Sequence, residues 1–198
     1  MLTFILGGAR SGKSDLAAKL AAAGGRDVLF VATMRELDDE MRARVAAHQA
    51  ARPPHWRTIQ APVDVGAALQ QHARKGEFVI VDCVTAWIAN VILDALPDPD
   101  AASIDAVAAL MVSIEQQTAD VIGWARRFEG DVAVVSNDVG AGVVPAYALG
   151  RIFRDATGSA NKALAAAAGR TLYVIAGLAL DLRALGGLPA EAAADQAR

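Results

Sequence analysis

An apolar run followed by a glycine-rich stretch opens the chain and restricts its fold more than any other feature. Residues 2–6 have the length and composition of a buried strand, and residues 15–20, rich in alanine and leucine, are typical of a helix. Between them, four residues separate Gly7 from Gly12-Lys13-Ser14, which is the phosphate-loop pattern. In such a loop the glycines let backbone N–H groups converge on one anion, and the helix dipole strengthens that field. The order of strand, loop and helix therefore predicts a site for a nucleoside triphosphate.

The residues of the loop have distinct predicted roles. Lys13 should reach the β- and γ-phosphates, and the Ser14 hydroxyl should ligate Mg²⁺. Asp82 ends a second strong apolar run, where proximity to Mg²⁺ would keep its carboxyl ionised, and we predict it as the other metal ligand. The whole loop is predicted to bind the nucleotide: Gly7, Gly8, Ala9, Arg10, Ser11, Gly12, Lys13 and Ser14.

Apolar runs of strand length alternate with helical stretches along the rest of the chain. We expect strands at 28–33, 56–59, 77–82, 131–136 and 171–176, and helices at 36–49, 63–75, 85–96, 147–168 and from the cap Ser103 to 128. This alternation predicts an α/β fold with a mostly parallel sheet and helices on both faces. Residues 1–183 would form one catalytic domain, and the tail 184–198 is expected to fray. The functional residues should lie at the carboxyl ends of the strands.

Composition excludes several classes of protein. A net charge of −3 indicates no general attraction to nucleic acid. The single cysteine, Cys83, rules out an internal disulfide and fits a reducing compartment. The first apolar run is too short for a signal peptide, and no run approaches the roughly 20 residues of a membrane helix. We therefore expect a soluble, cytoplasmic protein without a membrane span.

His48 is the most informative of the histidines. On the predicted helix 36–49 it lies eleven residues after Leu37, about 20° from it around the axis. Arg44 and Arg52 lie one turn before and one turn after it, where they would disfavour protonation of the imidazole and could clamp phosphate oxygens. A neutral imidazole is what a nitrogen nucleophile requires. Spacing alone leaves two interpretations open: a nucleophile, or a helix-edge histidine with no task.

The stretch that follows the strand 131–136 has two glycines, in the pattern Asn137-Asp138-Val139-Gly140-x-Gly142. Glycines would allow its backbone to approach a ligand closely. An ordinary tight connection explains the pattern equally well, so the sequence leaves this choice open.

Six motifs occur in an order that resembles the bifunctional adenosylcobinamide kinase / adenosylcobinamide-phosphate guanylyltransferase family. The resemblance covers residues 2–183, and the motifs are 7–14, 37–41 with His48, Arg52-Pro53, Trp56-x-Thr58, 136–145 and 153–161. It implies a recombinase-like P-loop fold and a homo-oligomer, with a ring of three subunits as one arrangement. It also implies two reactions. A kinase step phosphorylates the aminopropanol hydroxyl of adenosylcobinamide with ATP or GTP, and a second step transfers GMP from GTP onto that phosphate through a GMP-histidine intermediate.

The family's histidine matches His48, so the resemblance implies that His48 and Lys13 are catalytic. The nucleotide-binding residues that we predict beyond the loop are Ala32, Thr33, Met34, Arg44, Gln49, Arg52, Gln60 and Asp82. Three positions depart from the family pattern, and one of them is Asp82, where many relatives have a longer acid. Gln60 stands where a glutamate is usual, and an amide accepts the N–H groups of guanine less well than a carboxylate. Lys162 stands where a glutamine is usual.

Two other functions remain open from the residues. A P-loop small-molecule kinase without transferase activity would transfer only the γ-phosphoryl group. A non-catalytic nucleotide-binding switch would hold GTP through Lys13 and Asp82. Only the bifunctional enzyme would become labelled by α-labelled GTP.

Overall fold

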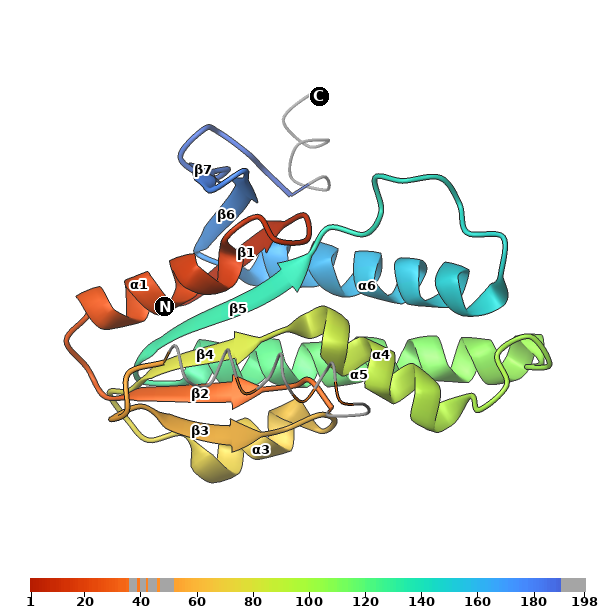
Figure 1. The fold of residues 1–198 in the computed structure, drawn as a ribbon, viewed down its shortest axis with the longest axis horizontal. Coiled ribbons are helices and arrows are strands. Elements are labelled where there is room, and N and C mark those ends of the chain that lie inside the picture. Colours follow the sequence, from red (N-terminus) through yellow and green to blue (C-terminus); the bar gives the residue numbers. More distant parts are fainter. Residues whose placement is uncertain (36–38, 40–41, 43–45, 47–51, 190–198) are drawn as a thin grey trace.

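A seven-stranded sheet forms the centre of the computed structural model, which describes residues 1–35, 39, 42, 46 and 52–189 (Figure 1). The strand order is β3-β2-β4-β5-β1-β6-β7. The strands are β1 (Leu2–Gly7), β2 (Val28–Ala32), β3 (Arg57–Gln60), β4 (Phe78–Asp82), β5 (Asp131–Asn137), β6 (Arg170–Ile175) and β7 (Leu178–Asp181). Strands β1 to β6 pair in parallel, and β7 pairs antiparallel with β6. The predicted α/β class with a mostly parallel sheet is confirmed.

Helices cover both faces of the sheet, as the sequence predicts. The labelled helices are α1 (Lys13–Ala23), α3 (Val65–His72), α4 (Val84–Ala95), α5 (Ile104–Arg127) and α6 (Ala148–Ala167). Helix α1 packs Ala17 and Ala21 against Ile5 and Ile80 on one face. The other four cover the opposite face, and their apolar side chains form the larger core cluster. The predicted helix 36–49 lies almost wholly outside the described residues. Among the described residues, no helix has the length and apolar character to cross a membrane.

The seventh strand corrects the expectation that 171–176 is the last strand. Ala176 and Gly177 form a two-residue turn with φ of 49° and 81°, which allows β7 to fold back on β6. The sequence of β7 gave little signal because the strand is short and most of its side chains are exposed. The turn also contacts the phosphate loop, since the Gly177 N–H donates to the Ser11 carbonyl at 3.0 Å. The hairpin therefore supports the loop from one side.

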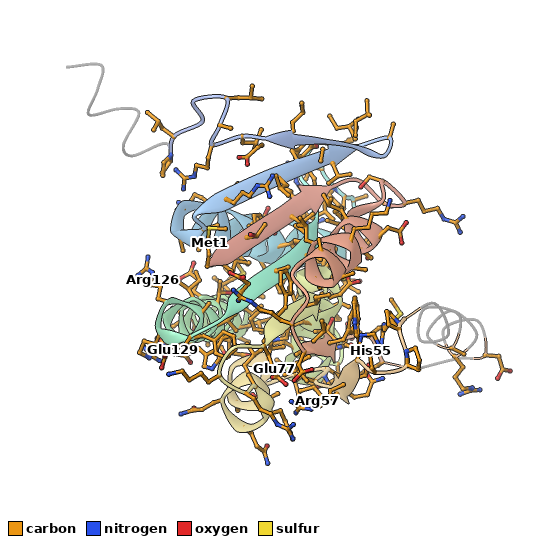
Figure 2. All side chains as sticks on the ribbon, turned by 90° about the vertical axis from the view of Figure 1, so that its left-hand side faces the viewer. Met1, His55, Arg57, Glu77, Arg126 and Glu129 are labelled. Atoms are coloured by element: carbon orange, nitrogen blue, oxygen red, sulfur yellow. The ribbon has the colours of Figure 1, made fainter. Side chains whose placement is uncertain are left out.

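A buried carboxylate, Glu77, directly precedes β4, at the opposite end of that strand from Asp82. Figure 2 labels Glu77 beside Arg57, with which it forms an ion pair. The second oxygen of Glu77 accepts the Arg74 N–H at 2.7 Å, and Arg57 also donates to the His72 carbonyl at 2.8 Å. These contacts tie β3, α3 and β4 together. Glu77 is therefore a structural acid.

Candidate active site

The phosphate loop starts at Gly7, the last residue of β1, and its last residues, Lys13 and Ser14, form the first turn of α1. Gly7 lies so close to β6 that a Cβ there would be 2.2 Å from the Val174 carbonyl oxygen and 3.0 Å from Ser11 Oγ. Gly12 precedes the first residue of α1 with φ of 96°, a left-handed conformation that other residues rarely adopt. Both glycines of the motif are therefore required by the backbone path, one by close approach and one by conformation.

Lys13 is buried, with 6% of its surface exposed. Its Nζ donates to the Gly8 carbonyl at 2.5 Å and to Ser11 Oγ at 3.4 Å, so the loop wraps around the ammonium group. Burial lowers the pKa of Lys13, while the electrostatic effects of Cys83 and Asp82 act in the opposite direction. An ammonium group has three donors, and one remains for a phosphate oxygen.

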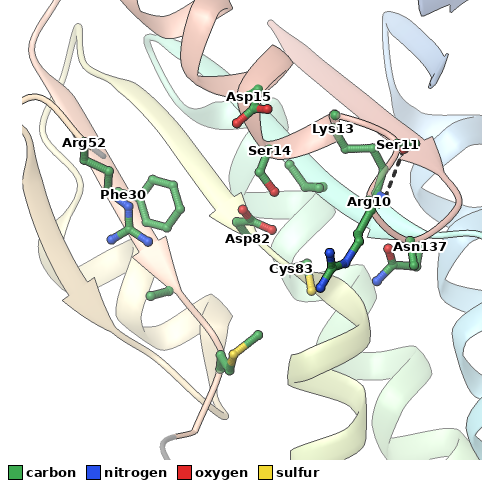
Figure 3. Close-up of a pocket in the computed structure, with 15 residues that line it drawn as sticks. Arg10, Ser11, Lys13, Ser14, Asp15, Phe30, Arg52, Asp82, Cys83 and Asn137 are labelled. Atoms are coloured by element: carbon green, nitrogen blue, oxygen red, sulfur yellow. Dashed lines mark hydrogen bonds between the residues drawn. The ribbon is translucent and has the colours of Figure 1, made fainter. Parts of the chain in front are cut away.

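A cavity of about 420 Å³ opens at the carboxyl ends of β1, β2, β4 and β5 (Figure 3). It brings together ten of the residues predicted from the sequence: Ala9, Arg10, Ser11, Gly12, Lys13, Ser14, Ala32, Met34, Arg52 and Asp82. Five further residues of the described part of the chain also line it: Asp15, Phe30, Cys83, Val135 and Asn137. Segments more than 100 residues apart along the chain thus meet at one edge of the sheet, where a parallel sheet places its ligands.

Some predicted residues lie elsewhere. Thr33 is fully buried and does not line the cavity. Its hydroxyl donates to the Cys83 carbonyl and accepts the Cys83 N–H, both at 2.7 Å, so it fixes the backbone beside Asp82. Gln60 is exposed at the end of β3, also outside the cavity lining. Gly7 and Gly8 shape the loop without lining the cavity. Arg44, His48 and Gln49 lie outside the described residues.

Arg52 forms the wall opposite the phosphate loop. Its guanidinium carbon lies 3.5 Å from the centroid of the Phe30 ring, a cation–π contact with β2 (Figure 3). Its Nη1 is buried and, within the described part of the chain, has no hydrogen-bond partner. Burial lowers the pKa of Arg52, and the charge of Asp82 raises it. Because a buried donor without a partner is costly, this geometry favours an anionic ligand between Arg52 and Lys13.

Ser14 and Asp82 offer oxygens from two directions. Figure 3 shows the hydroxyl of Ser14, in the first turn of α1, and the carboxylate of Asp82, at the end of β4, pointing toward one another. Mg²⁺ is usually held by one or two protein oxygens together with phosphates. No group of three or more His, Cys, Asp or Glu side chains in the described ranges would hold a metal by itself. The donor set therefore fits Mg²⁺ bound together with a triphosphate.

Of the stretch 137–142 at the end of β5, Asn137 lines the cavity and Gly140 and Gly142 do not, so the close approach of these glycines to a ligand stays a prediction. Asn137 lines the cavity, and its Nδ2 donates to Thr85 Oγ1 at 2.7 Å. Asn161 of α6 donates to the Asn137 carbonyl at 3.1 Å and accepts from Ser136 Oγ at 2.6 Å. The beginning of the connection is thus a fixed part of the cavity. The sequence did not indicate that Phe30 and Val135 line the cavity, because apolar residues of a buried strand have the same pattern whether they face a ligand site or the core.

We expect Arg52→Met to weaken the binding of Mg²⁺-GTP by roughly tenfold to a hundredfold, because the ligand loses charged hydrogen bonds. The thermal stability of the protein without nucleotide should stay the same or rise, because the buried Nη1, which has no hydrogen-bond partner among the described residues, no longer has to be desolvated. Isothermal titration calorimetry and thermal unfolding measure the two effects. Arg35→Met is the matched control, since Arg35 is paired with Asp94 outside the cavity lining. Equal affinities of wild type and Arg52→Met would contradict the assignment.

Solved structures of low sequence identity share this fold. A Pyrococcus horikoshii OT3 protein matches with a TM-score of 0.50 and 8% identity, over 91% of this chain and 85% of its own. A prototypical ATPase from the type III secretion system of pathogenic bacteria matches with a TM-score of 0.50 and 11% identity, over 94% of this chain and 58% of its own. Both similarities concern the fold alone.

Sequence comparison is more specific. The model of the cobinamide kinase / cobinamide phosphate guanyltransferase family matches residues 3–182. The bifunctional adenosylcobalamin biosynthesis protein CobP of Pseudomonas aeruginosa is 38% identical over 92% of this chain and 98% of its own length. The corresponding CobU proteins of Escherichia coli K12 and Salmonella typhimurium are 36% and 33% identical, each over 92% of this chain and 100% of its own length. The chain therefore belongs to the cobinamide kinase / cobinamide phosphate guanyltransferase family.

Proposed function

We propose that this chain catalyses both reactions of its family on adenosylcobinamide. The first is phosphorylation of the aminopropanol hydroxyl by ATP or GTP, and the second is transfer of GMP from GTP onto the new phosphate. The observation that carries the proposal is the cavity that the phosphate loop, Asp82 and Arg52 line together. One triphosphate site can serve both reactions, because they attack different phosphorus atoms of the same kind of ligand.

In the proposed kinase step, the hydroxyl oxygen attacks the γ-phosphorus and the bond to the β-phosphate oxygen breaks. The hydroxyl proton is released and the nucleoside diphosphate leaves. Lys13 and the loop N–H groups stabilise the charge that develops on the phosphate oxygens. Ser14 and Asp82 would hold Mg²⁺, which when bound neutralises charge on the phosphates.

In the proposed transferase step, an imidazole nitrogen of His48 attacks the α-phosphorus of GTP and pyrophosphate leaves. A phosphate oxygen of the acceptor then attacks the same phosphorus and displaces the histidine, which gives adenosylcobinamide-GDP. The covalent intermediate divides one difficult substitution into two easier ones. Arg52 supports this step, because it offers a buried guanidinium donor four residues from His48 in the sequence. Arg44 and Gln49 are proposed to contact the same nucleotide.

We further propose that the protein acts as a homo-oligomer, with a trimer as the arrangement that the resemblance implies. Exposed apolar side chains on the hairpin of β6 and β7, namely Ile175, Leu178 and Leu180, support this proposal. The single free cysteine, Cys83, supports a reducing compartment such as the cytoplasm.

Incubation with α-labelled GTP tests the transferase assignment. We expect the wild-type protein to carry GMP in a bond that is labile in acid and stable in base. His48→Ala should lose the label completely and retain much of the kinase activity. His55→Ala is the matched control, because His55 lies in an exposed turn outside the cavity lining (Figure 2).

The other outcomes distinguish the competing functions. An unlabelled wild type that still phosphorylates cobinamide would be a kinase without transferase activity. An unlabelled wild type that binds GTP and transfers no phosphoryl group would be a nucleotide-binding switch. Label retained in His48→Ala would contradict the assignment of the nucleophile.

A further inference from the structure

The connection between β5 and α6, which begins just after the cavity residue Asn137, exposes apolar side chains. Val143 is 95% exposed, Val144 61% and Tyr147 60%. The stretch 139–150 contains no charged residue, which is unusual for an exposed connection. Figure 1 shows this segment arching away from the end of β5 before it reaches α6. We call residues 139–147 the apolar loop.

Both ends of the apolar loop are fixed. At its start, the Asp138 N–H donates to the Gly7 carbonyl at 3.0 Å, and the Asp138 carboxylate accepts the Tyr173 hydroxyl at 2.8 Å. At its end, Arg151 donates to the carbonyls of Pro145 and Ala146 at 3.2 and 2.7 Å. The apolar side chains are therefore presented by an anchored segment, which lowers the entropy cost of binding.

The first turn of α6 is shaped to receive the end of the apolar loop. A Cβ at Gly150 would lie 2.7 Å from Pro145 Cβ and 2.7 Å from the Tyr147 ring. The absence of a side chain at Gly150 allows the loop to fold back on the helix. Asp100, from the connection between α4 and α5, accepts the Ala148 N–H at 3.2 Å and holds the same turn from the other side.

The position of the apolar loop in the fold makes it a candidate for contact with the acceptor substrate. Asn137 lines the cavity, and the loop begins two residues later. A cavity of about 420 Å³ that receives a triphosphate has no room for a corrin macrocycle as well. The acceptor must nevertheless bring its hydroxyl to the γ-phosphorus, so the macrocycle has to bind to a surface next to the cavity.

We propose that the apolar loop binds the corrin macrocycle of the acceptor, an inference that rests on the proposed function. The rim of a corrin carries methyl groups and uncharged carboxamide arms. Val143, Val144 and Tyr147 match the methyl groups, and the backbone groups of a glycine-containing loop match the amides. Because the loop carries no charge, no ionised side chain has to be desolvated on binding. The apolar loop thereby holds the aminopropanol arm over the cavity.

The test is the rate of adenosylcobinamide phosphorylation at saturating Mg²⁺-ATP. In the double variant Val143→Ser with Val144→Ser, the KM for adenosylcobinamide should rise by roughly tenfold to a hundredfold, and kcat should change far less. The label from α-labelled GTP should be unaffected, because its formation needs no acceptor. Val112→Ser on α5 is the matched control, since Val112 is 65% exposed and is not among the residues that line the cavity.

Three results would overturn the inference. An unchanged KM in the double variant, with an active wild type, would refute it and leave the proposed function intact. An unchanged KM together with a smaller sedimentation coefficient would show that the apolar loop is an interface between copies of this chain. A wild type that does not phosphorylate adenosylcobinamide at all would refute both the proposed function and this inference.

Discussion

Lys13→Ala should lower both the kinase rate and GMP labelling by roughly 100-fold or more. Lys13 is buried in the loop that it completes, with its ammonium group directed among the Gly8 and Ser11 oxygens. Both proposed reactions use this one group to stabilise charge on the phosphates. Initial rates with adenosylcobinamide and the yield of labelled protein from α-labelled GTP measure the two losses.

The control for Lys13→Ala is Lys19→Ala, which removes the same charge from an exposed position of the same helix. It should leave both rates unchanged. The thermal stability of Lys13→Ala should not fall greatly, because the variant also removes the cost of burying a charged group. If one activity were lost and the other preserved, the two reactions would not share the phosphate site.

Gly7→Ala should destabilise the fold by about 3 kcal/mol, which for a chain of this size corresponds to a drop of about 6–12 °C in Tm. The added Cβ would lie 2.2 Å from the Val174 carbonyl oxygen. That oxygen belongs to the backbone of β6 and cannot rotate away, so β1 and β6 would have to separate at the cavity. Differential scanning calorimetry measures the change.

Gly8→Ala is the matched control in the same loop. A Cβ at Gly8 meets no atom within 4 Å, and its φ is not among the positive values. Its Tm should stay within a few degrees of the wild type. Equal Tm values for the two variants would show that β6 does not constrain Gly7 in this way.

The sequence predicted best those elements whose structure depends on residues close to one another in the chain. Strand β1, the loop and α1 are adjacent in sequence, and each residue type has one evident role there. Ser103 accepts the Ala106 N–H at 3.2 Å, which confirms the cap predicted for α5. The alternation of apolar strand-length runs with helical stretches predicted the parallel sheet, because two consecutive parallel strands need a crossover connection between them.

Elements that depend on distant partners were harder to predict. Strand β7 exists because a turn with positive φ returns it to β6, and its own side chains indicate little. Thr33 stood at the end of a predicted strand, as a ligand-binding residue would. Its hydroxyl instead bonds to the backbone of Cys83, fifty residues away. A position at the end of a strand predicts that a residue lies near the ligand site. Whether its side chain lines the cavity depends on the direction in which that side chain points.

By itself, the sequence determined that the chain has a triphosphate loop on an α/β sheet, because that motif is a local backbone shape with fixed residue requirements. Only the tertiary structure decided which walls complete the cavity. It placed Arg52 on Phe30 across from Lys13, and it brought Asn137 into the same cavity lining as Asp82. The reason is physical: a hydrogen bond or a ring contact depends on distance in space, and neighbouring strands of this sheet come from remote parts of the chain.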